Sequence, residues 1–298
     1  MRTGSFDGPG EPDTVVYEGF RSSVQINAPG GWQMARAQIS IKGMAKDVME
    51  QLTIINYTNF ELQRNEVLIE ATDQSGEYNT LFSGTIGNAY VDYMGAPDVS
   101  LMIDAYQTLF SATEASAPTS WPGPNSVSVI AKSLAESFGY ELVNSGVDST
   151  ITDQVLVGSA VNQLRDLCRN ANCQLWLDSR SRTANIAPQG TPMNFDEVEI
   201  NQGSGLVGWP TPNHLGVDLT CLFNPAIRHG GPIRLTTTVS VSSQSLAIAD
   251  QRAGQQVVNL SGKWYVSGMS IMLDCETPGG AWFMYLTCYP ISSYVRTR

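Results

Sequence analysis

Apolar and polar residues alternate strictly in several segments of the chain. In residues 35–42, apolar side chains occupy every second position between polar or charged ones, a period of two that is typical of a strand with one buried face. Similar patterns predict strands at residues 23–27, 66–71, 80–86 and 99–106. We therefore expect an antiparallel β region at residues 14–110, which includes one short helix at residues 45–52.

The period changes to that of a helix in the middle of the chain. Val127, Ile130 and Leu134 recur at helical spacing after Ser126, a favourable capping residue, and before Gly139. A second apolar stripe predicts a helix at residues 159–171, followed by strands at 174–177 and 184–187. Because such stripes must be buried against other elements, we expect a small α+β insert at residues 126–190. Residues 111–125, rich in Pro and Ser, are predicted to form a linker or long loop.

Strand patterns return after the insert and indicate a second β region at residues 191–298. The predicted strands are residues 197–200, 216–222, 232–235, 263–267, 269–275 and 282–289. The last two are expected to form a hairpin around the Pro-Gly turn at residues 277–280. Residues 235–249 fit either an exposed strand or a connection held by partners, and residues 1–13 are expected to form an N-terminal arm.

Charge limits the classes of partner. Only 15% of the residues are charged, and the formal net charge is −11, which disfavours a surface that reads nucleic acid. A surface with so few charges fits binding to protein partners, or solvation by Ser, Thr, Asn and Gln. Because no long apolar run and no signal-peptide core is visible, we expect a soluble chain without stable membrane insertion.

No motif predicts a cofactor, metal or catalytic site. The cysteines lack CxxC spacing and are expected to be small core residues in a reducing compartment; they are Cys168, Cys173, Cys221, Cys275 and Cys288. Glycine-rich nucleotide loops and a GxSxG nucleophile motif are absent from the sequence. We therefore expect no catalytic residues, no cofactor and no metal.

Two alternative functions remain open at the sequence level. Asp196 and Glu199 could serve as the carboxylates of a cell-wall glycosidase, although clustered carboxylates more often lie on a solvated surface. Trp32 and Trp121 could form a carbohydrate-binding platform, although scattered tryptophans more often fill a core or an interface.

Residues 205–235 stand out because glycines and prolines punctuate a run of short strands. Gly208-Trp209-Pro210 predicts a tight turn, residues 222–225 an apolar bend, and Gly230-Gly231 a further turn. Such residues suit either barrel corners or subunit contacts, and packing within one subunit is the alternative. The candidate interface or structural residues are Phe6, Gly208, Trp209, Pro210, Leu222, Phe223, Asn224, Pro225, Gly230 and Gly231.

The same run resembles phage tail baseplate hub proteins, the trimeric hub family of contractile-tailed phages, which is related to type VI secretion spike hub domains. The resemblance rests on residues 207–210, 216–217, 222–225, Arg228 and residues 230–231. Residues 82–86, 97–99, 263–266 and 277–282 are similar to the same family. The resemblance implies β-barrel-like hub domains, and together with the α+β insert predicted above it gives a mainly β fold with a small α+β insert, α+β overall.

The resemblance also implies a structural, non-enzymatic function in the virion tail baseplate. The expected partners are two further copies in a homotrimer, a tail tube or tube-initiator protein, a spike or needle protein and other baseplate subunits. The ring is expected to surround a channel, adapt a sixfold tube to a threefold spike, and let DNA pass during ejection without specific binding. Virus assembly is expected in the host cytoplasm.

Overall fold

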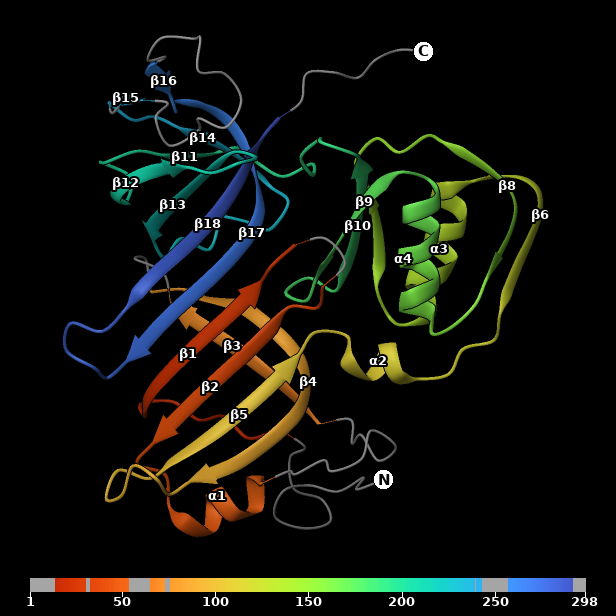
Figure 1. Cartoon of the computed structure of the whole chain (residues 1–298). Coiled ribbons are helices and arrows are strands. Elements are labelled where there is room, and N and C mark those ends of the chain that lie inside the picture. The colour runs from red at the N-terminus through yellow and green to blue at the C-terminus, as the bar shows by residue number, and fades with distance from the viewer. Residues whose placement is uncertain are drawn as a thin grey trace.

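In the computed structural model, residues 14–30, 33–53, 65–72, 76–238, 240–242 and 257–291 are described, and they form one large sheet with an inserted unit beside it (Figure 1). The predicted N-terminal arm with Phe6, Trp32 and most of residues 235–249 lie outside the described residues. No helix within these ranges is long and apolar enough to cross a bilayer.

The large sheet runs in the order β12-β13-β18-β17-β1-β2-β5-β4-β3, with β14 also paired to β17 and β11 paired to β14. Neighbouring strands are antiparallel except for the parallel pair β11 and β14. Strands of the first β region are β1 Arg21–Ala28, β2 Arg36–Lys42, β3 Glu66–Thr72, β4 Tyr78–Asp92 and β5 Ser100–Tyr106. Strands of the second are β11 Val198–Ile200, β12 Leu206–Pro212, β13 Val217–Leu222, β14 Pro232–Leu235, β17 Gly262–Cys275 and β18 Trp282–Pro290. A separate ribbon pairs β15 Ser240–Ser242 with β16 Val257–Asn259.

The two β regions meet where β1 pairs with β17. Ile26 lies opposite Ile271 in this pairing, and both side chains are buried. Their neighbours Ala37 on β2 and Leu286 on β18 belong to the same apolar cluster. Strands from both regions therefore share one sheet and one core, in which each fully buried aliphatic side chain contributes about 1.5–3 kcal/mol.

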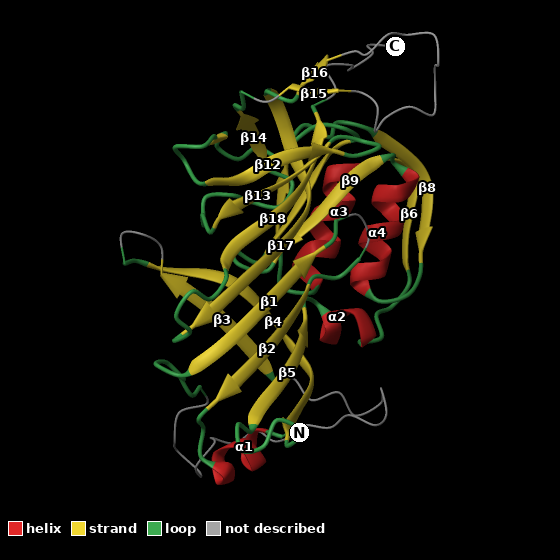
Figure 2. Cartoon of the chain, turned by 60° about the vertical axis from the view of Figure 1, so that its left-hand side comes forward, coloured by secondary structure: helices red, strands yellow, loops and turns green. Residues whose placement is uncertain are grey.

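The insert packs two helices between a three-stranded sheet and a two-stranded ribbon (Figures 1 and 2). Its helices are α3 Val127–Ser137 and α4 Ala160–Asn170. Its strands are β6 Thr119–Ser126, β7 Glu141–Asn144, β8 Thr150–Leu156, β9 Cys173–Asp178 and β10 Thr183–Pro188. Ser159 caps α4 by accepting a hydrogen bond from the backbone N–H of Asn162, and the predicted stripe with Leu164 and Leu167 is fully buried.

The mainly β fold class with a small α+β insert is confirmed, but the large sheet does not close into a barrel within the described chain. Its path ends at β12 on one side and at β3 on the other. The short helix of the first region is α1 Lys46–Leu52, whose Met49 packs with Leu101 in a separate, smaller apolar cluster. Cys168, Cys173, Cys221 and Cys288 are buried, as expected of small core residues.

Three local predictions were wrong. Residues 111–125 are not a continuous loop, because helix α2 Leu109–Thr113 leads into β6, and β6 pairs with β8 despite its prolines. A register shift between Trp121 and Pro124 accommodates these prolines, which cannot donate to a ladder. Residues 263–275 form one strand with an irregularity near Gly268 instead of two strands. The predicted turn at residues 208–210 is a bulge inside β12.

Candidate functional site

Within the described residues, no helix covers the face of the large sheet that points away from the core, and we call it the open face. No helix in the described ranges makes a substantial packing contact with β13, β18, β17, β1 or β2 (Figure 2). Strand register aligns the outward side chains in rows that cross six strands. One row is Thr220, Tyr285, Ser270, Asn27, Arg36 and Tyr106, and the adjacent row is Leu222, Phe283, Met272, Gln25, Gln38 and Asp104.

Hydrogen bonds fix part of this open face. Ser270 Oγ donates to Asn27 Oδ1 at 2.7 Å, which links β17 to β1. Arg36 donates from Nη2 to Asp104 Oδ1 at 2.6 Å, and its guanidinium lies 5.5 Å from the ring centroid of Tyr106. The hydrogen bond to Asp104 raises the pKa of Arg36, so the two rows carry one mutually neutralised ion pair. These two rows are thus mostly polar, carry a single ion pair and are partly cross-linked between strands.

A groove of about 480 Å³ lies at the β12 end of the open face. Trp209 lines it together with Tyr285, Thr220 and Ser270, and the Trp209 side chain is 58% exposed. The β12 bulge shifts the register between Val207 and Thr211, and Gly208 within it adopts φ +67°. Partly exposed Trp and Tyr side chains combine a large apolar area with a polar tip, which suits contact with a protein partner.

The other predicted residues of the 205–235 run lie mainly at packed corners. Pro210 is buried, whereas Leu222 is 41% exposed on the open face. Phe223 is buried and contacts Trp282 edge to face, with ring centroids 6.1 Å apart. Asn224 Oδ1 accepts from the Ala226 backbone N–H and closes the bend. The structure therefore brings Trp209 and Leu222 onto the open face but places Phe223 in the core.

The bend at Pro225 also holds the insert. Arg180, in the turn between β9 and β10, donates to the carbonyl oxygens of Pro225 and Ile227 at 3.3 and 3.5 Å. Beside it, Arg228 pairs with Asp178 at 3.0 Å. Burial lowers the pKa of Arg180 to about 10, although the nearby Asp178 carboxylate opposes this shift. A buried guanidinium thus anchors the insert to the corner of the large sheet.

Gly230 and Gly231 let this corner approach the insert closely. Gly230 adopts φ +80°, and a Cβ there would lie 3.0 Å from Met193 Cγ and 3.1 Å from Trp176 Cδ2. Its backbone N–H donates to the Val266 carbonyl at 2.8 Å. The corner therefore requires glycine at residue 230 for both its conformation and its contacts.

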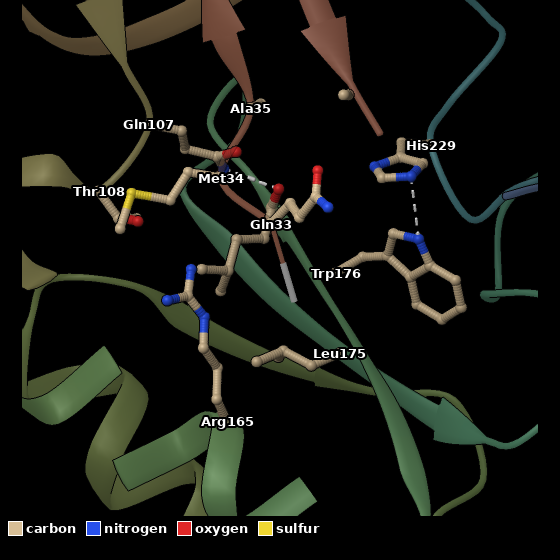
Figure 3. A pocket seen from close by; sticks show the side chains of 11 residues that line it. Gln33, Met34, Ala35, Gln107, Thr108, Arg165, Leu175, Trp176 and His229 are labelled. Carbon is tan, nitrogen blue, oxygen red and sulfur yellow. Dashed lines mark hydrogen bonds between the residues drawn. The ribbon is translucent and has the colours of Figure 1, made fainter. Parts of the chain in front are cut away.

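A second, smaller cavity of about 30 Å³ lies between the insert and the large sheet (Figure 3). At one end, His229 Nε2 lies 2.9 Å from the Ser267 carbonyl oxygen and 3.2 Å from Trp176 Nε1. The two contacts are alternatives, because Nε2 donates to the carbonyl when protonated and accepts the indole N–H when it is not. Burial lowers the pKa of His229 to about 4, so the imidazole is neutral at pH 7.

The residues of the two alternative functions are placed apart from these cavities. Asp196 and Glu199 are exposed, and neither lines the groove or the junction cavity. Trp121 packs against the core of the insert, and its Nε1 is buried without a hydrogen-bond partner within the described chain. These positions give no support to a paired-carboxylate cleft or to a platform on Trp121.

Sequence patterns did not point to Arg180, His229 or the Arg36–Asp104 pair. Arg36 does lie on the polar side of the predicted strand at residues 35–42, but alternation carries no information about its partner 68 residues away. Arg180 is a single polar residue in a turn, and His229 lies beside the Gly230-Gly231 turn without a pattern that predicts its partners. Their roles follow only from the packing of the insert against the sheet.

The family model described as baseplate hub gp41 matches residues 5–243 of the chain. No curated protein sequence matches the chain.

Among solved structures, the fold is similar to the tail protein from Neisseria meningitidis MC58, with 10% identity, a TM-score of 0.55, and coverage of 91% of this chain and 97% of that chain. The 43 kDa tail protein of prophage MuSo2 from Shewanella oneidensis has 7% identity, a TM-score of 0.54, and coverage of 93% and 95%.

The E. coli c3393 protein is similar at 8% identity and a TM-score of 0.56, with coverage of 92% of this chain and 74% of that chain. It is described as a type VI secretion component with structural similarity to the T4 tail proteins gp27 and gp5. At these identities the likenesses show a shared fold.

Proposed function

Because the chain belongs to the baseplate hub gp41 family, we propose that three copies close into a ring around a central channel in a phage tail baseplate. The ring joins a sixfold tail tube, or its initiator protein, to a threefold spike or needle. DNA passes through the channel during ejection without specific binding. The function is structural, and the chain carries out no catalytic step.

The open face of the large sheet is the observation that supports this proposal best. It spans strands of both β regions, and its two central rows contain mostly polar side chains, whose single cation, Arg36, is bound to Asp104. Affinity for DNA comes mainly from cationic contacts with phosphates. We propose that this face lines the channel, where such a surface lets DNA slide. The two β regions, residues 14–110 and 191–298, then act as the two hub domains of each subunit.

A closed ring requires two different complementary surfaces on each subunit, because its contacts are heterologous. The groove around Trp209 supplies one of them, at the β12 end of the sheet. We propose that it receives a segment of the adjacent hub subunit. Stable obligate contacts of this kind bury roughly 2,000–5,000 Å².

The oligomeric state and the role of Trp209 are tested together by light scattering. The purified chain should have a solution mass near three times 32.3 kDa, and its particles should be rings in electron micrographs. Trp209→Ala should shift the mass towards that of the monomer. Leu215→Ser is the matched control, because Leu215 is 63% exposed in the connection between β12 and β13 but does not line the groove.

A monomer at every concentration, both alone and with tube and spike proteins, would overturn the trimeric ring. If Trp209→Ala leaves the trimer intact, the ring stands but the groove is not the contact between its subunits.

Ejection of DNA by phage carrying Gln38→Lys, which adds a cation to the middle of the open face, tests the channel lining separately. We expect slower ejection, and an unchanged rate would place this face outside the channel.

A further inference from the structure

The groove around Trp209 contains one carboxylate and no cation. Asp218 is half-buried, and it is the only charged residue among those that line the groove. Its Oδ1 accepts a hydrogen bond from Asn213 Nδ2 at 2.9 Å, and within the described chain the carboxylate forms no ion pair. A carboxylate at the edge of a partly apolar groove is stabilised by a cation that enters the groove. The groove therefore fits a positively charged side chain.

Two aromatic side chains of the same groove favour arginine as that cation. Trp209 is 58% exposed and Tyr285 is 43% exposed, and both line the groove. Asp218 lies opposite Thr287 on β18, which is two residues along that strand from Tyr285. Because residues two apart in a strand share a face, the carboxylate and the tyrosine ring lie on the same side of the sheet. A planar guanidinium can stack on an aromatic ring while it donates to a carboxylate.

Residues 292–298 of the chain carry this chemistry. They include Arg296 and Arg298 and no acidic residue, in a chain with 28 acidic and 17 basic residues. Tyr294 and Val295 directly precede the first arginine and add apolar area. Arg296 follows Ile291, a described residue, by five positions, which span up to about 17 Å when extended. The segment is therefore long enough to place a guanidinium well beyond the end of β18.

The direction of β18 favours the groove of another copy over the groove of the same chain. The strand runs from Tyr285 in the groove towards Ile291, which packs against Trp176 and Met193 at the insert. The chain thus leaves its own groove, and a return would require a reversal directly after Ile291. Residues 292–298 contain no Gly or Pro, the strongest turn-forming residues, whereas Tyr, Val and Thr favour extended backbone.

We infer that residues 292–298 of one subunit occupy the groove of the adjacent subunit. There, Arg296 or Arg298 pairs with Asp218 and stacks on the exposed Trp209 ring. The inference rests on the proposed ring and names the segment that its groove receives. Such a contact joins two different surfaces of neighbouring copies, as closure of a ring requires.

Photo-cross-linking of the full chain tests this contact. Benzoylphenylalanine is placed at Tyr294, and in a second preparation at Val295, and the linked peptides are identified by mass spectrometry. Mixing ¹⁴N- and ¹⁵N-labelled protein separates links between chains from links within one chain. We expect links between chains, from the 292–298 segment to peptides that contain Trp209 or Tyr285.

Charge variants test the pairing with Asp218. Asp218→Asn should raise the protein concentration for half-maximal cross-linking between chains about tenfold, the effect of losing one charge-assisted interaction. Arg296→Gln combined with Arg298→Gln should do the same. Glu141→Gln is the matched control, because Glu141 is exposed and does not line the groove. Asp218→Arg should abolish the link, and adding Arg296→Asp and Arg298→Asp should restore it.

The inference is overturned if the links form only within one chain, if they reach no peptide of the groove, or if Asp218→Asn behaves like Glu141→Gln. Light scattering on the same samples separates this failure from failure of the ring. A trimer without the expected links leaves the ring standing and removes the 292–298 segment as its contact. A monomer at every concentration removes both.

Discussion

Replacing Gly230 with alanine separates the conformational and the steric requirements of the corner where the insert meets the sheet. Gly208 serves as the comparison, because both glycines have positive φ, +80° and +67°. A Cβ at Gly208 would meet no atom within 4 Å, whereas a Cβ at Gly230 would press on Met193 and Trp176. The backbone N–H of Gly230 is bound to the Val266 carbonyl, which limits relaxation.

The expected losses of unfolding free energy follow from these differences. A left-handed conformation costs an L-residue about 1–2 kcal/mol. Replacing glycine also lowers the conformational entropy of the unfolded chain, which stabilises the folded protein by about 0.4–1 kcal/mol and offsets part of this cost. Gly208→Ala should therefore lose about 1 kcal/mol. Gly230→Ala should lose about 2–4 kcal/mol, because overpacking adds about 1–3 kcal/mol.

Urea unfolding followed by tryptophan fluorescence measures both variants against wild type. The difference between the two variants isolates the effect of crowding at Gly230. Equal losses would refute the steric part of the reasoning. A loss of less than about 0.5 kcal/mol at both positions would refute the conformational part as well.

The remaining predictions concern charged and titratable groups. Arg180→Met should lower the free energy of unfolding by about 2–3 kcal/mol and speed protease cleavage near the insert, because two carbonyls of the bend lose a charged donor; Arg169→Met should change both measurements little. His229 has a folded pKa of about 4, below its unfolded value, so the unfolded state binds the extra proton between pH 4 and 6.5. Stability should therefore fall by up to about 3 kcal/mol as the pH drops through this window, and His229→Gln should abolish that part of the slope in urea titrations. Arg36→Gln should lower stability by less than about 1 kcal/mol in the same assay, because its pair with Asp104 is partly exposed; a larger loss would mean that the pair organises the sheet.

Sequence periodicity predicted the elements whose stability comes from one buried face. The alternation of residues 35–42 predicted β2, and the stripe through Ile130 and Leu134 predicted α3. In both cases the apolar positions of the pattern identify the face that is buried. The strand β6 was missed, since its prolines resemble loop residues and only its pairing with β8 makes it a strand. The anchoring of the insert was also beyond prediction, because Arg180 meets Ile227 only after the chain has folded.

The pairing of β1 with β17 has a consequence for synthesis on the ribosome. Ile26 and Ile271 are neighbours in the finished sheet, yet nearly the whole chain separates them in sequence. While the intervening residues are being translated, the edge of β1 that β17 will occupy is an unpaired strand edge, able to pair with other chains. Contacts between such distant residues also slow folding. The nascent protein should therefore depend on chaperones, and cells that are short of them should accumulate it as aggregates.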